Sequence, residues 1–324
     1  MIYNSGGYSL EVDLLKDLHN WAHDALTGMG LRNVREDALE QYSSMLFRRL
    51  VAKPRRIEKS KEFICPEDYK EGLRIFEEAV RTGRDLTPYM SKTIEDAEYD
   101  DGFLFDWSLF HFHLGIGPDT KNPRFVERTG PVLIAFINIR DDDIMYFVQI
   151  RNHSTDQLWY DDGLVRIVAD NWPSVVEKYR MHGIASMTEQ VTWEQRKQLR
   201  KNLHANVPVD LSDGRVFFSM NWGITAAGTS FRAMRDADSK RWDARLMMEE
   251  IENHVDLICE TINKKIDGDS FQITLVMPGY CDYTFKVVGA PVYIRLIRIP
   301  SENRFITCVG DDMQSIDRYL KQKE

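Results

Sequence analysis

The sequence predicts an α+β fold, and two observations indicate it. Apolar residues follow helical spacing in some segments and form short apolar runs in others. Three hairpin-like pairs of apolar runs are separated by helical stretches, which argues against a parallel, doubly wound sheet. We therefore expect a mainly helical N-terminal part, a small antiparallel sheet and a C-terminal α+β unit. The predicted domains are residues 1–185 and 186–324.

The N-terminal part is predicted to contain three helices. Leucines and alanines recur at helical spacing over residues 9–27, and Gly28 and Gly30 end the pattern. A second helix is expected over residues 36–50, and a third over 66–83, with Pro66 at a favoured first-turn position. The basic stretch 48–61 is interpreted as a charged linker between helices rather than as a phosphate-binding surface, because almost no aromatic residues interrupt it.

The middle of the chain is predicted to form the small sheet. Residues 103–114, 131–139 and 144–150 are apolar runs of the kind that form strands, and the acidic residues 141–143 are expected to turn the second run into the third. Residues 164–179 have helical spacing but include Pro173, which predicts a helix broken into two pieces.

The remaining residues are predicted to alternate helices with strands. We expect a helix from residue 188 to 201, a hairpin with its turn at residues 212–214, and a long helix over 231–266. Four strands are expected at 271–277, 284–288, 292–299 and 305–309, followed by a helix at 313–323. Loop 225–230, before the long helix, is interpreted as a helix cap rather than a phosphate-binding loop.

The composition indicates a soluble cytoplasmic protein with no membrane association. The chain has 324 residues, 43% of them hydrophobic, and a formal net charge of -9, which disfavours nucleic-acid binding by the whole surface. No run reaches the roughly 18 apolar residues that span a bilayer, and the first residues do not resemble a secretory signal. The four cysteines lack CxxC spacing, as expected of free thiols in a reducing compartment.

The most distinctive local pattern is His111-Phe112-His113 within an apolar run. In a strand, both imidazoles would lie on one face, and His153 could approach them across an antiparallel sheet. Three interpretations remain open. The histidines could be structural, they could hold a zinc ion that activates water, or they could catalyse acid–base chemistry on RNA without a metal. In the third, arginines nearby would bind the phosphate.

Residues 66–153 resemble the core of RelE-type endoribonuclease toxins. The resemblance includes the segment His113-Leu114-Gly115, the arginines Arg124 and Arg128, the two apolar runs with the acidic turn between them, and His153. It implies a helical hairpin packed on an antiparallel sheet, and RNA as the substrate. It also implies that Arg128 and His153 are this chain's counterparts of the family's site residues.

These observations lead to the hypothesis of a metal-independent RNA-cleaving enzyme, such as a bacterial toxin or a phage-defence effector, with no cofactor. His113 and His153 are the expected acid and base, in either order, and His111 is expected to orient one of them or to contact the substrate. Arg128, with Arg124 or Arg151, would stabilise charge on the phosphate. The alternatives are a His-ligated zinc hydrolase, and a non-enzymatic binding or assembly protein with a protein partner or a homo-oligomer. The latter would use an apolar stripe within residues 231–266.

Overall fold

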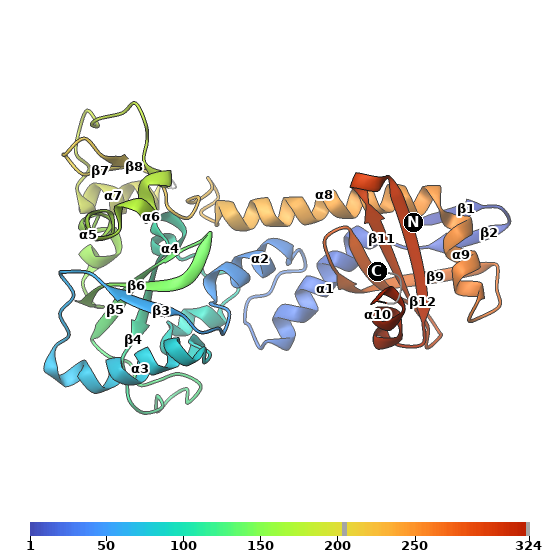
Figure 1. Cartoon of the computed structure of the whole chain (residues 1–324), viewed down its shortest axis with the longest axis horizontal. Coiled ribbons are helices and arrows are strands. Elements are labelled where there is room, and N and C mark those ends of the chain that lie inside the picture. The colour runs from blue at the N-terminus through green and yellow to red at the C-terminus, as the bar shows by residue number, and fades with distance from the viewer. Residues whose placement is uncertain (203–205, 322–324) are drawn as a thin grey trace. The chain divides into compact units, whose positions relative to one another are not determined.

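The computed structural model describes residues 1–202 and 206–321, and the predicted α+β fold is confirmed (Figure 1). The chain divides into two compact units. The first unit combines Met1–Tyr42 with Arg235–Glu324, and the second is Ser43–Met234. This division differs from the expected boundary after residue 185, which falls inside the second unit. The reason is a long-range pairing, because strand β2 near the N-terminus lies parallel to strand β9 near the C-terminus.

The first unit is built on a six-stranded sheet in the order β1-β2-β9-β10-β11-β12. Its strands are β1 (Ile2–Ser5), β2 (Tyr8–Glu11), β9 (Ser270–Pro278), β10 (Asp282–Val287), β11 (Tyr293–Ile299) and β12 (Arg304–Gly310). The sheet is contacted by α1 (Leu14–Gly28), α9 (Val255–Asn263) and α10 (Met313–Lys321). Asp243 of the long helix 231–253 also accepts hydrogen bonds from the Tyr283 hydroxyl and from Arg298 of this sheet. The four predicted C-terminal strands are confirmed, whereas β1 and β2 were not predicted. Residues 322 and 323 of the predicted last helix lie outside the described residues.

Two long elements connect the units along the chain, α2 (Leu39–Arg48) and α8 (Phe231–Asn253). The single helix predicted over 231–266 is interrupted at His254, where α9 follows α8. The proposed partner-binding stripe in this region is core, since Met247, Ile251 and Ile258 are fully buried. Of its large side chains, Trp242 is the one that is exposed, at 61%. The stripe therefore offers no continuous apolar surface.

The second unit is built on a four-stranded sheet in the order β3-β6-β5-β4. Its strands are β3 (Arg56–Lys59), β4 (Leu109–His113), β5 (Pro131–Asn138) and β6 (Asp141–Asn152), with β3 parallel to β6 and the other pairs antiparallel. The predicted β5–β6 hairpin is confirmed, but β6 already begins at Asp141, so the acidic residues belong to the strand. Lys53 forms ion pairs with Asp142 and Asp143, which compensates their charge.

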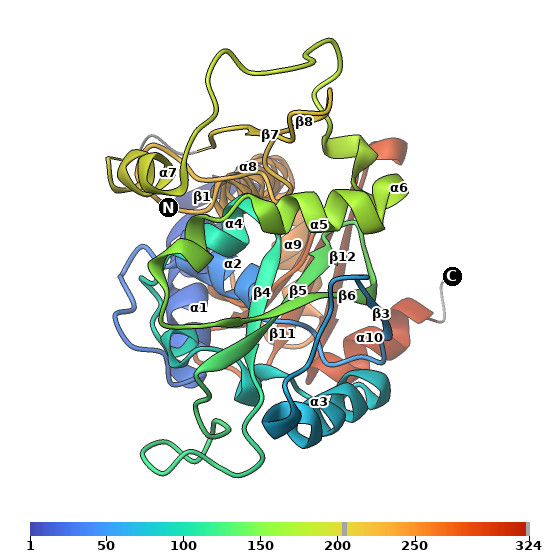
Figure 2. The same cartoon turned by 90° about the vertical axis from the view of Figure 1, so that its left-hand side faces the viewer.

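Each face of this sheet is covered by its own helices (Figure 2). Helix α3 (Lys70–Thr82) buries Phe76 against Phe112 and Phe147 on one face. The other face packs against α4 (Gly102–Trp107), α5 (Gly163–Asn171) and α6 (Pro173–Val176). Helix α5 ends two residues before Pro173, as predicted. The four-stranded sheet, whose strand β4 carries His111 and His113, is thus held between two layers of helices.

The prediction of a strand throughout residues 103–114 is wrong for its first part. Residues 102–107 form helix α4, whose first turn is capped by Asp101, because its Oδ1 accepts a hydrogen bond from the Leu104 N–H at 3.0 Å. Ser108 has a left-handed backbone, with φ 57°, and ends the helix before β4. Every residue from Phe103 to Leu114 is buried, so apolar character alone cannot distinguish a helix from a strand here.

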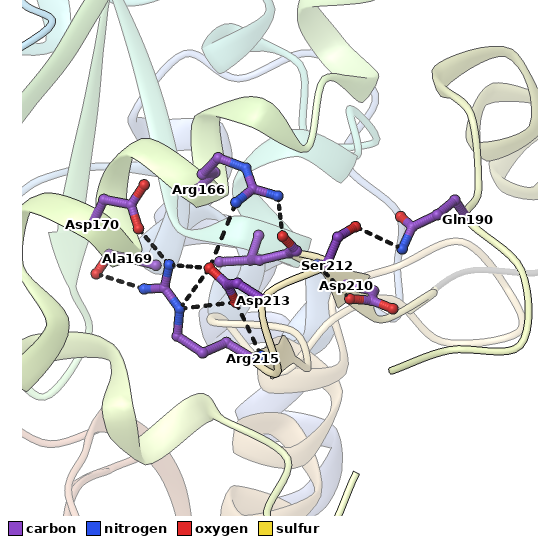
Figure 3. Close-up of polar contacts among 9 residues, drawn as sticks. Arg166, Ala169, Asp170, Gln190, Asp210, Ser212, Asp213 and Arg215 are labelled. Atoms are coloured by element: carbon purple, nitrogen blue, oxygen red, sulfur yellow. Dashed lines mark hydrogen bonds and ion pairs between the residues drawn. The ribbon is translucent and has the colours of Figure 1, made fainter. Parts of the chain in front are cut away.

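A polar network holds a small hairpin onto α5 (Figure 3). The hairpin consists of β7 (Val209–Asp210) and β8 (Val216–Phe217), follows α7 (Trp193–Lys201), and turns at residues 212–214 as predicted. Arg215 pairs with Asp170 on α5 and with Asp213 in the turn. Arg166, which is also on α5, forms an ion pair with Asp213 at 3.6 Å. We call these four residues, Arg166, Asp170, Asp213 and Arg215, the Asp213 network. Their charges compensate one another.

Candidate active site

The sheet register places three histidines on one face. On β4, His111 pairs with Ile134 and His113 pairs with Val132 of β5, so both imidazoles share a face. The β5–β6 register then shifts between Ile134 and Ala135, which leaves Val148 as an extra residue. Because side chains alternate between the two faces along a strand, the extra residue moves each later side chain of β6 to the face opposite the one it would otherwise occupy.

The bulge therefore decides where His153 lies. Arg151 pairs with Val132, the partner of His113, and His153 follows two residues later on the same face. The His153 N–H donates to the Gly130 carbonyl at 2.7 Å, which extends the pairing by one residue. Without the extra residue, His153 would lie on the opposite face of the sheet.

The three imidazoles form a close triangle, as the sequence predicts. Ring centroids are 5.6 Å apart for His111 and His153, 5.2 Å for His113 and His153, and 6.4 Å for His111 and His113. The indole of Trp159, in the 3₁₀ helix Asp156–Tyr160, lies edge-on to His111 at 4.9 Å and to His153 at 5.2 Å. This ring buttresses both histidines, and sequence reasoning did not identify it.

One hydrogen bond assigns the tautomer of His113. Its Nδ1 accepts from the Thr129 backbone N–H at 3.2 Å, so in the neutral ring the proton is on Nε2. A neutral imidazole in this state has no lone pair left for a metal ion. Within residues 1–202 and 206–321, no group of three or more His, Cys, Asp or Glu side chains is arranged to hold one.

All three histidines have lowered pKa values. Burial lowers the pKa of His111 to about 3, and the charges of His153 and Arg128 act in the same direction. The pKa of His113 is also about 3, lowered first by burial and then by Arg128 and its two neighbouring imidazoles. Burial and Arg128 lower the pKa of His153. At neutral pH, His111 and His113 are therefore uncharged, and their low pKa values make them weak bases.

Arg128 lies beside the cluster but is incompletely paired. Its Nη2 donates to the Met90 carbonyl at 2.9 Å, while its buried Nη1 has no partner among the residues that the structure describes. The guanidinium lies 5.8 Å from the centre of the Phe125 ring. Burial lowers its pKa to about 10, which Asp119 opposes. Its positive charge disfavours protonation of all three imidazoles.

The other two predicted arginines are paired with carboxylates. Arg124 forms an ion pair with Glu95 at 2.7 Å, and Arg151 forms one with Asp161 at 3.0 Å. Neither arginine lines the cleft described next. The structure thus brings together the three predicted histidines with Arg128, and places the two predicted substrate arginines in other contacts.

A cleft of about 670 Å³ opens beside the histidines. His111 and His153 line it, whereas His113 does not and lies behind them. Its wall also contains aromatic rings, two cations and a loop before α8, namely Tyr99, Phe103, Trp159, Tyr160, Arg200, Lys201, Ala227 and Gly228. The loop acts as the expected helix cap, since the Ser230 Oγ accepts from the Ala233 N–H at 3.2 Å. The cleft therefore combines stacking surfaces, charged side chains of both signs, since Asp100 and Asp101 also line it, and neutral imidazoles.

Sequence reasoning missed Asp101, which lines the same cleft. Part of its side chain reaches solvent, but the surrounding protein buries it enough to raise its pKa. The Leu104 N–H and the charges of Arg48 and Arg200 oppose that rise. In the sequence, Asp100-Asp101-Gly102 is indistinguishable from a turn, so no local signal could have identified this carboxyl.

Two buried arginines support this wall of the cleft. The Arg48 side chain is 1% exposed; its Nη1 donates to the Asp96 carbonyl at 3.0 Å, and its Nε and Nη2 lack partners in the described chain. Arg200 pairs with buried Asp106 at 2.8 Å and lies over the Trp107 ring. The basic residues 53–59 are structural, and Lys59 pairs with Glu77 at 2.7 Å. The interpretation of residues 48–61 as a linker between helices is wrong in part, because residues 56–59 form strand β3 alongside β6.

Searches for related proteins returned no match. No family model, no curated protein and no solved structure matches the chain. No helix within the described residues is both long and apolar enough to cross a bilayer. The four cysteines are free thiols. Any assignment of function must therefore come from the site itself.

Proposed function

We propose that this protein cleaves RNA by acid–base catalysis, without a metal ion, in the cleft lined by His111 and His153. The observation that supports this most directly is the convergence of uncharged imidazoles on an open cleft, with no carboxylate paired to them in the described chain. Uncharged imidazole is the form that a general base requires. Structural histidines need no cleft in front of them.

In the proposed reaction, His153 is the general base, since it is the more exposed of the two histidines lining the cleft. It removes the proton from the ribose 2′-hydroxyl, and the 2′-oxygen attacks the adjacent phosphorus. The bond from phosphorus to the 5′-oxygen breaks as that oxygen takes a proton. An acid with a raised pKa suits that transfer, so we assign it to the Asp101 carboxyl.

The remaining predicted residues would act indirectly. His113 is a positioning residue, because its Nδ1 is held by the Thr129 N–H and its ring packs 5.2 Å from His153. Arg128 does not line the cleft. We assign to it the electrostatic role of keeping the imidazoles unprotonated. His111 contacts the substrate or orients it beside His153.

The lining of the cleft suits a single-stranded RNA. Bases stack on aromatic side chains, and Tyr99, Trp159 and Tyr160 provide such rings. Lys201 and Arg200 supply positive charge for the phosphate backbone, although Arg200 is also paired with Asp106 and the carboxylates of Asp100 and Asp101 line the same cleft. The RelE-like pattern of residues 66–153 supports the same substrate, and a cytoplasmic toxin or phage-defence effector is the setting we propose.

The test compares cleavage of a single-stranded RNA in EDTA by the wild type, His111→Ala, His153→Ala and Asp101→Asn. Asparagine retains the helix-capping ability of Asp101. His182→Ala is the matched control, since His182 is an exposed histidine of the same unit. We expect the wild type and the control to cleave in EDTA, and the other three variants to lose about 10²- to 10⁴-fold in rate.

Other outcomes would contradict the proposal. Activity that disappears in EDTA and returns only with zinc would favour a zinc hydrolase. Wild-type protein that neither cleaves RNA nor slows growth when expressed would leave the histidines as structural residues of a binding protein. Circular dichroism of each variant separates loss of catalysis from loss of folding.

A further inference from the structure

A second pocket in the same unit is lined mainly by aromatic side chains. We call it the aromatic pocket; its volume is about 430 Å³, and it is lined by Arg140, Tyr179, Asn206, Phe218, Ser219, Trp222 and Phe231. Its size is within the range of small-molecule sites. Phe218 is 43% exposed and Trp222 is 40% exposed. Single exposed aromatic residues are common, but two that line one hollow indicate a binding surface.

The backbone holds these rings in place at a conformational cost. Trp222 has φ 70°, a left-handed backbone conformation that is unfavourable for a bulky residue. The Asn206 side chain secures the segment by bonding both backbone groups of Ile224, at 2.6 and 2.7 Å. The Trp222 and Phe231 rings are nearly parallel, at 16°, with centroids 6.3 Å apart. The stacking surface is therefore formed before any ligand binds.

The charge at the pocket is positive. Arg140 is exposed in the β5–β6 turn, and within the described residues only its backbone N–H is bonded, to the Asn138 Oδ1 at 3.2 Å. Lys178 lies nearby, with its Nζ 5.0 Å from the centre of the Tyr179 ring. Burial and the charge of Arg140 lower the pKa of Lys178, while the charge of Asp141 opposes this, so two cations and one carboxylate lie close together. None of the described residues that line the pocket is acidic.

We infer that the aromatic pocket binds one nucleotide of a single-stranded RNA, with the base stacked on Trp222 and Phe218 and its phosphate on Arg140. A planar ring that carries a negative charge matches both the aromatic lining and the unpaired guanidinium. The inference rests on the proposed function for the identity of the ligand. The chain segment that follows β8 contributes to both sites, since Trp222 lines this pocket and Ile224 lines the cleft. The two sites thus share one short chain segment.

The test measures binding of a fluorescently labelled oligouridine to the full chain with His153→Ala, so that the RNA stays intact. Trp222→Leu, Phe218→Leu and Arg140→Gln are each added to this background. The control is Trp242→Leu, which removes a more exposed tryptophan of the first unit. We expect a loss of affinity of about 10-fold for Trp222→Leu, from lost stacking. The loss for Arg140→Gln should shrink at high salt, whereas the control binds like its background.

Failure of this inference is distinguishable from failure of RNA cleavage. Oligouridine affinity that is the same in all three variants overturns the inference, even where the wild type cleaves RNA. Binding of adenosine monophosphate without binding of oligouridine also overturns it, and indicates a site for a free nucleotide. Selective loss of binding in the variants supports it, even where the wild type cleaves nothing. Arg140→Gln removes no packing, so it remains informative if Trp222→Leu is unstable.

Discussion

The Asp213 network and the histidine cluster are two polar clusters of one unit that differ in how their charges are balanced. In the Asp213 network, each guanidinium meets a carboxylate, and Arg215 has two (Figure 3). In the histidine cluster, three imidazoles and Arg128 lie together, and no ion pair in the described chain includes any of them. The first arrangement lowers the pKa of Asp213 through its bond to Arg215.

This difference separates a structural role from a functional one. Balanced charges stabilise the hairpin and leave little capacity for chemistry. Unbalanced buried groups cost free energy, and proteins tend to retain them where function requires it. The histidine cluster also faces a cleft, whereas the Asp213 network fastens a turn to a helix. The following predictions test the comparison, from the largest expected effect to the smallest.

The largest effect concerns acid stability. The pKa values of His111 and His113 are about 3 when folded and about 6.5 when unfolded, so the unfolded chain binds more protons between those pH values. Stability is therefore complete above about pH 6.5 and falls as the pH falls. We expect a loss of about 2 kcal/mol per histidine from pH 7 to pH 5, measured by urea unfolding.

A matched pair of variants checks the origin of that loss. His111→Leu should remove about half of the pH dependence, because one of the two buried imidazoles is gone. Asp213→Asn should leave the dependence as in the wild type, since the pKa of Asp213 lies below its ordinary value and the group stays charged throughout this range. Equal pH dependence in wild type and His111→Leu would show that the cluster does not cause it.

The second effect comes from Arg128. Replacing it with methionine removes a positive charge that lowers the pKa values of all three histidines. We expect each pKa to rise, while burial keeps those of His111 and His113 below the ordinary value. NMR titration of the imidazole C–H signals measures this directly. Unchanged titration curves would show that burial alone sets these pKa values.

The third effect is a modest loss of stability at the balanced cluster. Arg215→Ala leaves Asp170 and Asp213 with fewer partners, but these carboxylates are 45% and 37% exposed, so solvent reduces the cost. We expect the free energy of unfolding to fall by about 1 kcal/mol, with RNA cleavage unchanged. Arg74→Ala, which removes an exposed ion pair with Glu71 on α3 of the same unit, is the control. Loss of cleavage in Arg215→Ala would contradict the structural role.

The smallest effect is a gain at Ser212 in the β7–β8 turn. Its backbone is left-handed, with φ 58°, which glycine adopts without strain. Ser212→Gly loses one exposed bond from Gln190, at 3.1 Å. The relief of strain should slightly exceed that loss, for a net stabilisation of about 0.5 kcal/mol in thermal unfolding. A lower melting temperature would show that the side-chain bond matters more.

Local patterns predicted much of the fold. The β5–β6 hairpin, the turn at residues 212–214 and the break before Pro173 depend on residues close in sequence, and all three are confirmed. Prediction was wrong where local signals were ambiguous, as at residues 102–107, where residues 103–107 are all buried and either a helix or a strand could bury them. The discontinuous first unit depends on the pairing of β2 with β9, for which the sequence has no local marker.

The sequence by itself determined that His111 and His113 share one face, because strand side chains alternate. It also placed His153 after a strand that pairs back toward them. Only the tertiary structure decided that His153 reaches their face, since this required the bulge at Val148. Likewise, only the packing of α4 against the sheet brought Asp101 to the cleft. Spacing along the chain determines which side chains share one element, whereas long-range pairing and packing determine which elements meet.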